Sequence, residues 1–145
     1  MQVVSVSAVA PNASSKPSDS RRRHSFPRRV RLLKHADFER VYKLGRRHFA
    51  AHITVFYLAR VEGDGFRVGF TVGRVLGGAV DRNRMKRRLR EAVRLLLPER
   101  PAPVDVVINP KKSMLAIEFT ELKKEVSRAF EVIQKFAEKR PPVLE

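Results

Sequence analysis

The stretch from Arg82 to Arg94 constrains this chain more than any other part of the sequence. Seven of its thirteen residues are Arg or Lys, and it holds a single acidic residue. At about 100° per residue, a helix over this stretch separates apolar from cationic side chains. Its apolar side would be formed by Met85, Leu89, Ala92, Val93 and Leu96. Its opposite side would be formed by Asn83, Arg87, Arg90 and Arg94, flanked by Arg84 and Lys86. The sequence therefore predicts one helix that packs on a core and offers guanidinium groups, which match phosphate oxygens bidentately, to an anionic partner.

An ordinary solvated helix face is the alternative interpretation of this stretch. Such a face usually mixes acids and bases at i,i+4 spacing, and only Arg87 and Glu91 are so spaced here. The whole chain has 31 Lys and Arg against 15 acids, a formal charge of +16, which favours a polyanion such as nucleic acid as partner. A membrane surface is disfavoured, because no apolar run approaches the roughly 18 residues of a spanning helix and the basic helix lacks the Trp and bulky aromatic residues of an interfacial one.

The sequence offers no recognisable catalytic constellation. It contains no cysteine, which excludes disulfides, thiolate zinc sites and cysteine nucleophiles and suits a reducing cytoplasm. Its acids are scattered rather than clustered, and its four His residues show no metal-ligand spacing. These His residues are His24, His35, His48 and His52. We therefore expect a binding protein with no catalytic residue and no metal ligand of its own.

Composition divides the chain into three segments. Residues 1–27, rich in Ser and Pro and ending in a basic run, are predicted to be a disordered extension, because they offer little apolar surface to offset the entropy of ordering. Residues 28–138 are predicted to form one folded domain, and residues 139–145 a flexible tail. The basic run could let the extension bind a polyanion, but an inert extension is equally consistent with the sequence.

Apolar periodicity predicts an α+β fold for the domain. The predicted elements are a helix over 36–44, strands over 53–59 and 66–72, the basic helix capped by Asp81, a strand over 104–108 and a final helix from about 120. The turn residues 62–65 predict that the first two strands form a hairpin, and there is room for a further short strand before Ile53. The order α-β-β-(β)-α-β-α predicts a small α/β sandwich with a mixed sheet, in which the basic helix joins two parallel strands.

Three aromatic residues form a second candidate site. Phe38 and Tyr42 share one face of the first helix, and Phe56 lies on one face of the first strand. If that helix packs on the sheet, these rings could line a groove and stack on unpaired bases, with about 1–3 kcal/mol for each stack. Aromatic residues at this spacing are also typical of a core, so spacing alone leaves both interpretations open.

The combination of these motifs resembles the protein subunit of bacterial ribonuclease P, over about residues 30–135. The basic helix carries Arg82-Asn83-Arg84-x-Lys86-Arg87-x-x-Arg90, and the strand before it, Phe66–Val72, leads into it through a Gly-rich loop. The first helix is similar to the family's opening helix in the pattern Leu33-Lys34-x-x-Asp37-Phe38-x-x-Val41-Tyr42-x-x-Gly45.

The resemblance implies an accessory subunit of a ribonucleoprotein endonuclease in the cytoplasm. The holoenzyme hydrolyses one phosphodiester to remove the 5′ leader of precursor tRNA, and the catalytic RNA carries the chemistry with bound Mg²⁺. The protein's basic helix docks on that RNA, and its central cleft holds the single-stranded leader. The RNA contacts implied by the resemblance are Arg82, Asn83, Arg84, Lys86, Arg87 and Arg90. We add two candidates, Arg94 from the cationic side of the same helix and Arg74 in the loop before it. The implied cleft residues are Phe38, Tyr42 and Phe56, and the family's parallel crossover is left-handed.

The loop before the helix departs from the family pattern. The family commonly has a Ser followed by two Lys where this chain has Gly73-Arg74-Val75, and an Asn where it has Gly78. Whether the 73–78 loop keeps its RNA contacts is therefore open. A ribosomal protein or RNA chaperone with a similar sandwich and no nuclease role is the alternative function.

Overall fold

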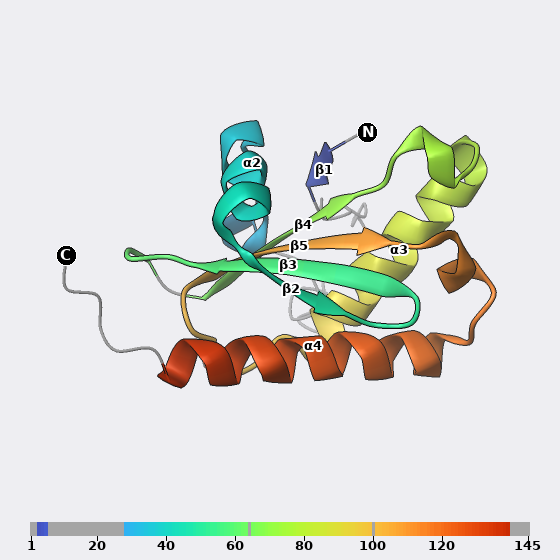
Figure 1. Ribbon diagram of the computed structural model, residues 1–145. Helices are drawn as coiled ribbons and strands as arrows, with labels where there is room; N and C mark the ends of the chain where they lie inside the picture. Colours follow the sequence, from blue (N-terminus) through green and yellow to red (C-terminus); the bar gives the residue numbers. More distant parts are fainter. Residues whose placement is uncertain (1–2, 6–27, 64, 100, 140–145) are drawn as a thin grey trace, which may run out of the picture.

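The computed structural model describes residues 3–5, 28–63, 65–99 and 101–139. A five-stranded sheet carries helix α2 on one face and helices α3 and α4 on the other (Figure 1). In chain order the elements are β1 (Val3–Ser5), η1 (Arg28–Val30), α2 (His35–Leu44), β2 (Arg46–Phe49), β3 (Ile53–Ala59), β4 (Phe66–Thr71), η2 (Arg74–Leu76), α3 (Ala79–Leu96), β5 (Val104–Pro110), η3 (Lys112–Leu115) and α4 (Phe119–Lys139). The predicted α+β sandwich is confirmed, and β2 is the short strand for which the sequence left room.

The strands lie in the order β1-β4-β5-β3-β2. Strands β4 and β5, joined through α3, are parallel as predicted, and every other pair is antiparallel. The predicted hairpin between β3 and β4 is wrong, because β5 lies between them. Strand β5 is mostly apolar and nearly all buried. A position between two neighbouring strands therefore keeps it away from solvent on both edges. The chain does reverse after β3, but the connection crosses the end of β5, where Arg60 N donates to the carbonyl of Pro103 at 2.8 Å.

The alternation of side chains along β3 divides the interior into two cores. Ile53, Val55 and Tyr57 are buried in the larger core, between the sheet and helices α3 and α4. Phe56 and Leu58 point to the other face and pack against the smaller core under α2. That smaller core consists of Leu32, Phe38, Val41 and Val107.

Two glycines allow α2 to lie close to the sheet. A Cβ atom at Gly69 of β4 would overlap Cζ of Phe38 and lie 2.9 Å from its Cε2. A Cβ atom at Gly45 would lie 2.5 Å from the carbonyl oxygen of Val41 and 2.6 Å from that of Tyr57. Gly45 follows the last residue of α2, and close backbone approach rather than a left-handed conformation requires glycine there, since its φ is −84°.

The start of α3 differs from the prediction. The helix begins at Ala79 after Gly78, which makes no side-chain cap, so the prediction that Asp81 is the N-cap is wrong. Asp81 lies in the first turn instead, where its carboxylate interacts favourably with the helix dipole. The preceding Gly77 has a φ of +139°, a conformation that favours glycine.

The two ends of the chain are described only in part. Val3–Ser5, inside the segment predicted to be a disordered extension, pairs with the edge of β4 in the register Val3↔Thr71. The rest of 1–27 and residues 140–145 lie outside the described residues, so the predicted domain boundaries stay predictions. Among the described helices, none combines the length and apolar character that crossing a membrane requires.

Candidate nucleic-acid interface

Helix α3 is held in place by its apolar side and by one arginine. Met85, Leu89, Ala92 and Val93 are fully buried, as the periodicity predicted. Arg88 turns toward the end of η3, where Nη1 donates to the carbonyl of Met114 at 2.6 Å and Nη2 to that of Ile117 at 2.7 Å. Arg88 is therefore a structural arginine, which separates it from the cationic residues on the outer side of the helix.

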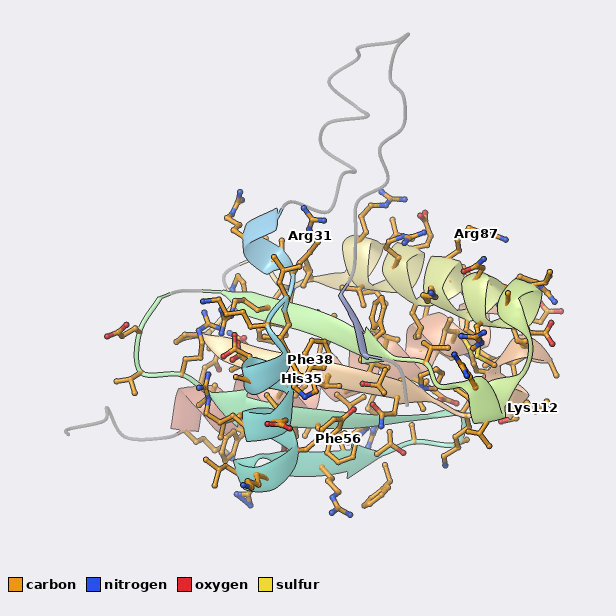
Figure 2. All side chains as sticks on the ribbon, turned by 90° about the horizontal axis from the view of Figure 1, so that it is seen from above. Arg31, His35, Phe38, Phe56, Arg87 and Lys112 are labelled. Carbon is orange, nitrogen blue, oxygen red and sulfur yellow. The ribbon has the colours of Figure 1, made fainter. Side chains whose placement is uncertain are left out.

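The outer side of α3 carries a set of unpaired polar and cationic side chains. Figure 2 shows Arg87 pointing away from the sheet. Asn83, Arg84 and Arg87 are exposed, and Lys86 and Arg90 are half-buried. None of these five makes a side-chain hydrogen bond or ion pair with any residue that the structure describes. Partial burial, and the neighbouring charge of Arg87, lower the pKa of the Arg90 guanidinium. This face therefore presents uncompensated positive charge and free donors.

The two remaining predicted contacts on α3 are engaged within the protein. Arg82 Nε donates to the carbonyl of Gly77 at 3.1 Å, which ties the helix to the loop before it. Arg94 forms an ion pair with Glu91, one turn earlier. The structure therefore groups five of the predicted side chains on one free face, while Arg94 is largely neutralised.

A hollow of about 900 Å³ lies beside the start of α3. Its floor comes from the carboxyl ends of the parallel strands β4 and β5, and its wall from η2 and Arg82. It is lined by Thr71, Gly73, Arg74, Val75, Leu76, Arg82, Asn109 and Pro110. Arg74, predicted as a loop contact, is exposed at this hollow.

Tyr42 connects the hollow to the aromatic residues under α2. Its hydroxyl donates to Asn109 Oδ1 at 3.0 Å, and the hydroxyl of Thr71 lies 2.5 Å away. The Tyr42 ring meets Phe56 edge-on at 4.9 Å, and the Arg47 guanidinium lies 5.5 Å from the Phe56 ring centre. Both rings are half-buried, and a chain of contacts runs from Arg47 of β2 through the two rings to Asn109 at the hollow.

The prediction that Phe38 lines a cleft is wrong for this structure. Its ring is 1% exposed, packed under α2 against Gly69 (Figure 2). A ring buried in this way has no face for a base. Asn109 and Arg47 belong to the surface, but sequence reasoning missed them, and Thr71 lies buried beneath it at 2% exposure. The signal for Thr71 and Asn109 was their position at the ends of two adjacent parallel strands.

An ion-pair network fixes α2 at the other end of its sheet face. Asp105 of β5 is fully buried and accepts Nε and Nη2 of Arg67, both at 2.8 Å, and Nη1 of Arg60 at 2.9 Å. Arg67 also lies 3.6 Å from Asp37 of α2. The hydrogen bond to Asp105 is the main reason that the pKa of Arg67 is raised. The network therefore links α2 to strands β4 and β5.

The fold and this surface define a class, that of small basic α+β sandwich proteins with a cationic helix face free for a polyanion. The Ribonuclease P family model matches residues 26–134 of the chain. The ribonuclease P protein component of Symbiobacterium thermophilum is 43% identical over 101 residues, which cover 70% of this chain and 88% of that protein. That of Exiguobacterium sp. is 43% identical over 108 residues, 72% of this chain and 93% of that protein.

Solved structures give the same result. The Staphylococcus aureus RNase P protein superposes with a TM-score of 0.63 at 25% identity, covering 71% of this chain and 94% of that one. The Thermotoga maritima RNase P protein, at 24% identity and a TM-score of 0.60, shares the fold. The chain belongs to the ribonuclease P protein family, as its motifs predicted. Such a protein is one subunit of an endoribonuclease holoenzyme in tRNA processing, and the family implies association with ribonuclease P RNA and a tRNA substrate. This assignment decides against a ribosomal protein or RNA chaperone.

Proposed function

We propose that α3 binds the catalytic RNA of ribonuclease P, and that the surface from Phe56 to the hollow holds the single-stranded 5′ leader of precursor tRNA. The protein thereby promotes Mg²⁺-dependent removal of the leader by the RNA subunit in the cytoplasm. The observation that carries the proposal is the free face of α3, where five polar or cationic side chains have no described partner within the protein. Unpaired cations of this kind contribute a favourable electrostatic free energy only when an anionic partner binds to them.

The electrostatic part of the mechanism follows from the charge of the chain. RNA carries a condensed layer of counterions, and each phosphate that meets a Lys or Arg releases some of them. A chain of net charge +16 therefore binds more weakly as salt increases. Close packing of the catalytic RNA against its substrate also brings phosphates together, and the cations of α3 reduce that repulsion.

The leader-binding part rests on the chemistry of the second surface. Half-buried Tyr42 and Phe56 offer ring edges and partial faces, half-buried Asn109 offers an amide donor and acceptor, and Arg74 offers a cation for a phosphate. Single-stranded RNA offers a complementary group for each: unstacked bases for the rings, base edges and 2′-hydroxyls for the polar groups, and phosphates for the cation.

The described residues do not offer the carboxylate cluster that a resident Mg²⁺ ion would need. Among the described residues, no group of three or more His, Asp or Glu side chains is placed to hold a metal ion. The free face of α3 is cationic and would repel one. We therefore assign the Mg²⁺ ions of the reaction to phosphate ligands of the RNA partner, and the protein to positioning and charge compensation.

Reconstitution tests this proposal. Adding the chain to its own ribonuclease P RNA should accelerate leader removal at low Mg²⁺ concentration. Arg84→Ala with Arg87→Ala should weaken binding to the RNA and reduce the slope of log K against log salt by about one to two. Lys123→Ala with Lys124→Ala on α4 removes the same charge elsewhere and should have a much smaller effect. Equal effects of the two pairs would show that α3 has no special role.

A second comparison tests the leader surface. Phe56→Ala should weaken binding of precursor tRNA to the holoenzyme more than binding of mature tRNA, because only the precursor has a leader. Equal losses for both would place Phe56 in a purely structural role.

A further inference from the structure

Two exposed valines lie among cationic residues at the start of α3 and in the loop before it. The side chain of Val75 in η2 is 88% exposed, and that of Val80 in the first turn of α3 is 74% exposed. They lie on either side of Gly77-Gly78, and Arg74 and Arg82 flank them in sequence. Scattered exposed apolar residues need no explanation. Two of them on either side of Gly77-Gly78, within a proposed cationic interface, indicate that the partner offers apolar groups as well as phosphates.

The backbone that carries these valines is fixed rather than loose. Within η2, Leu76 N donates to the carbonyl of Gly73 at 3.0 Å and Gly77 N to that of Arg74 at 3.1 Å. Arg82 Nε donates to the carbonyl of Gly77 at 3.1 Å. Valine itself has few rotamers because it is branched at Cβ. Ordering these side chains when a partner binds therefore costs little conformational entropy.

The surroundings of Val75 indicate the chemistry of that partner. Val75 shares the 900 Å³ hollow with the half-buried amide of Asn109 on the floor and with Arg74 and Arg82 on the wall. An apolar wall suits the face of a base or a ribose, the floor suits polar base edges or a 2′-hydroxyl, and the guanidinium groups suit a phosphate. A nucleotide combines these three groups, whereas an apolar protein segment would leave the arginines without a counter-charge.

We propose that Val75, at the hollow, and Val80, in the first turn of α3, make apolar contacts with bases or riboses of unpaired nucleotides in the bound RNA. This proposal rests on the proposed function and adds a part of the binding free energy that does not depend on salt. Burial of apolar surface releases no counterions, so these contacts change the affinity without changing the salt slope.

The test compares salt titrations of RNA binding by the full-length chain. The probe is a complex of its own ribonuclease P RNA with precursor tRNA that carries a leader. Val75→Ser with Val80→Ser should weaken binding about fivefold to tenfold at every salt concentration, with an unchanged slope. Arg74→Ala should reduce the slope by about one. Val61→Ser, at an equally exposed valine (69%) in the connection that enters the opposite end of β4, is the matched control and should bind like the wild type.

Two results would overturn the proposal. The double serine variant could change the salt slope, which would assign the valines an electrostatic or conformational role. It could also bind RNA as tightly as the wild type; if it then lost a self-association that the wild type shows in sedimentation, the surface would be a protein interface. If the wild-type chain itself binds neither RNA, the proposed function fails as well, so the two failures are distinguishable. Equal unfolding midpoints for all variants would show that loss of folding does not cause the differences.

Discussion

Gly69→Ala is the perturbation that tests most sharply how α2 is seated on the sheet. Gly69 lies in β4 directly under Phe38, and an added Cβ would overlap Cζ of that ring, with Cε2 at 2.9 Å and Leu32 Cβ at 3.2 Å. Carbon atoms in contact normally lie about 3.5–4.0 Å apart. Phe38 is 1% exposed and Leu32 fully buried, so neither can move into solvent to make room.

The expected loss of stability follows from these distances. Alanine in a strand interior is normally more favourable than glycine by about 0.5–1 kcal/mol. Overpacking a well-packed core by one methyl group costs about 1–3 kcal/mol, and overlap with a ring that has no free space lies at the upper end. We expect the free energy of unfolding to fall by about 2 kcal/mol, with α2 displaced from the sheet.

Urea unfolding of the full-length chain measures this loss. A second change, Phe38→Leu, removes the ring atoms that the new methyl group would meet, so the double variant should recover part of the loss that Gly69→Ala causes alone. Gly78→Ser is the matched control, because no atom lies within 4 Å of a Cβ there and serine is a good N-cap. An undiminished unfolding free energy for Gly69→Ala, or additive losses in the double variant, would refute the tight packing of α2.

Two further predictions concern side chains around the interface. Arg88→Met should lower the free energy of unfolding by about 1–3 kcal/mol, because two partly buried carbonyls lose their donor, yet leave the salt slope of RNA binding unchanged; a reduced slope would place Arg88 at the RNA instead. Burial, and then the charge of Arg128, hold the pKa of His48 below its ordinary value of 6.5. The unfolded chain therefore binds this proton more readily, so His48 contributes a loss of stability as the pH falls below about 6.5. His48→Asn should reduce the difference between unfolding free energies at pH 7.5 and pH 5, and an unchanged difference would show that His48 does not contribute.

Periodicity was enough to predict the local features of the fold. The two faces of β3 and the buried side of α3 were predicted correctly, because alternation and helical spacing depend only on neighbouring residues. The insertion of β5 between β3 and β4 could not be predicted in this way. A turn at 62–65 shows only that the chain reverses, whereas strand order depends on pairing between residues far apart in sequence.

The site shows the same division between local and long-range information. The cationic face of α3 was predicted from spacing, but the partners of its charges were not. Glu91 can reach Arg87 or Arg94 from the same helix, and the structure pairs it with Arg94. Phe38 and Tyr42 have the same helical signature, and only the position of Gly69 beneath α2 decides that Phe38 is buried while Tyr42 reaches the hollow.

The most direct test of the central claim maps which helix lies against the catalytic RNA. Because the chain contains no cysteine, one introduced cysteine can carry a photo-crosslinker at a single site. Glu91→Cys places the crosslinker on α3 and keeps every cation of that helix, and Lys124→Cys places it on exposed α4. We predict efficient crosslinking of the α3 derivative to ribonuclease P RNA and little from the α4 derivative. Crosslinking from α4 without crosslinking from α3 would contradict the account.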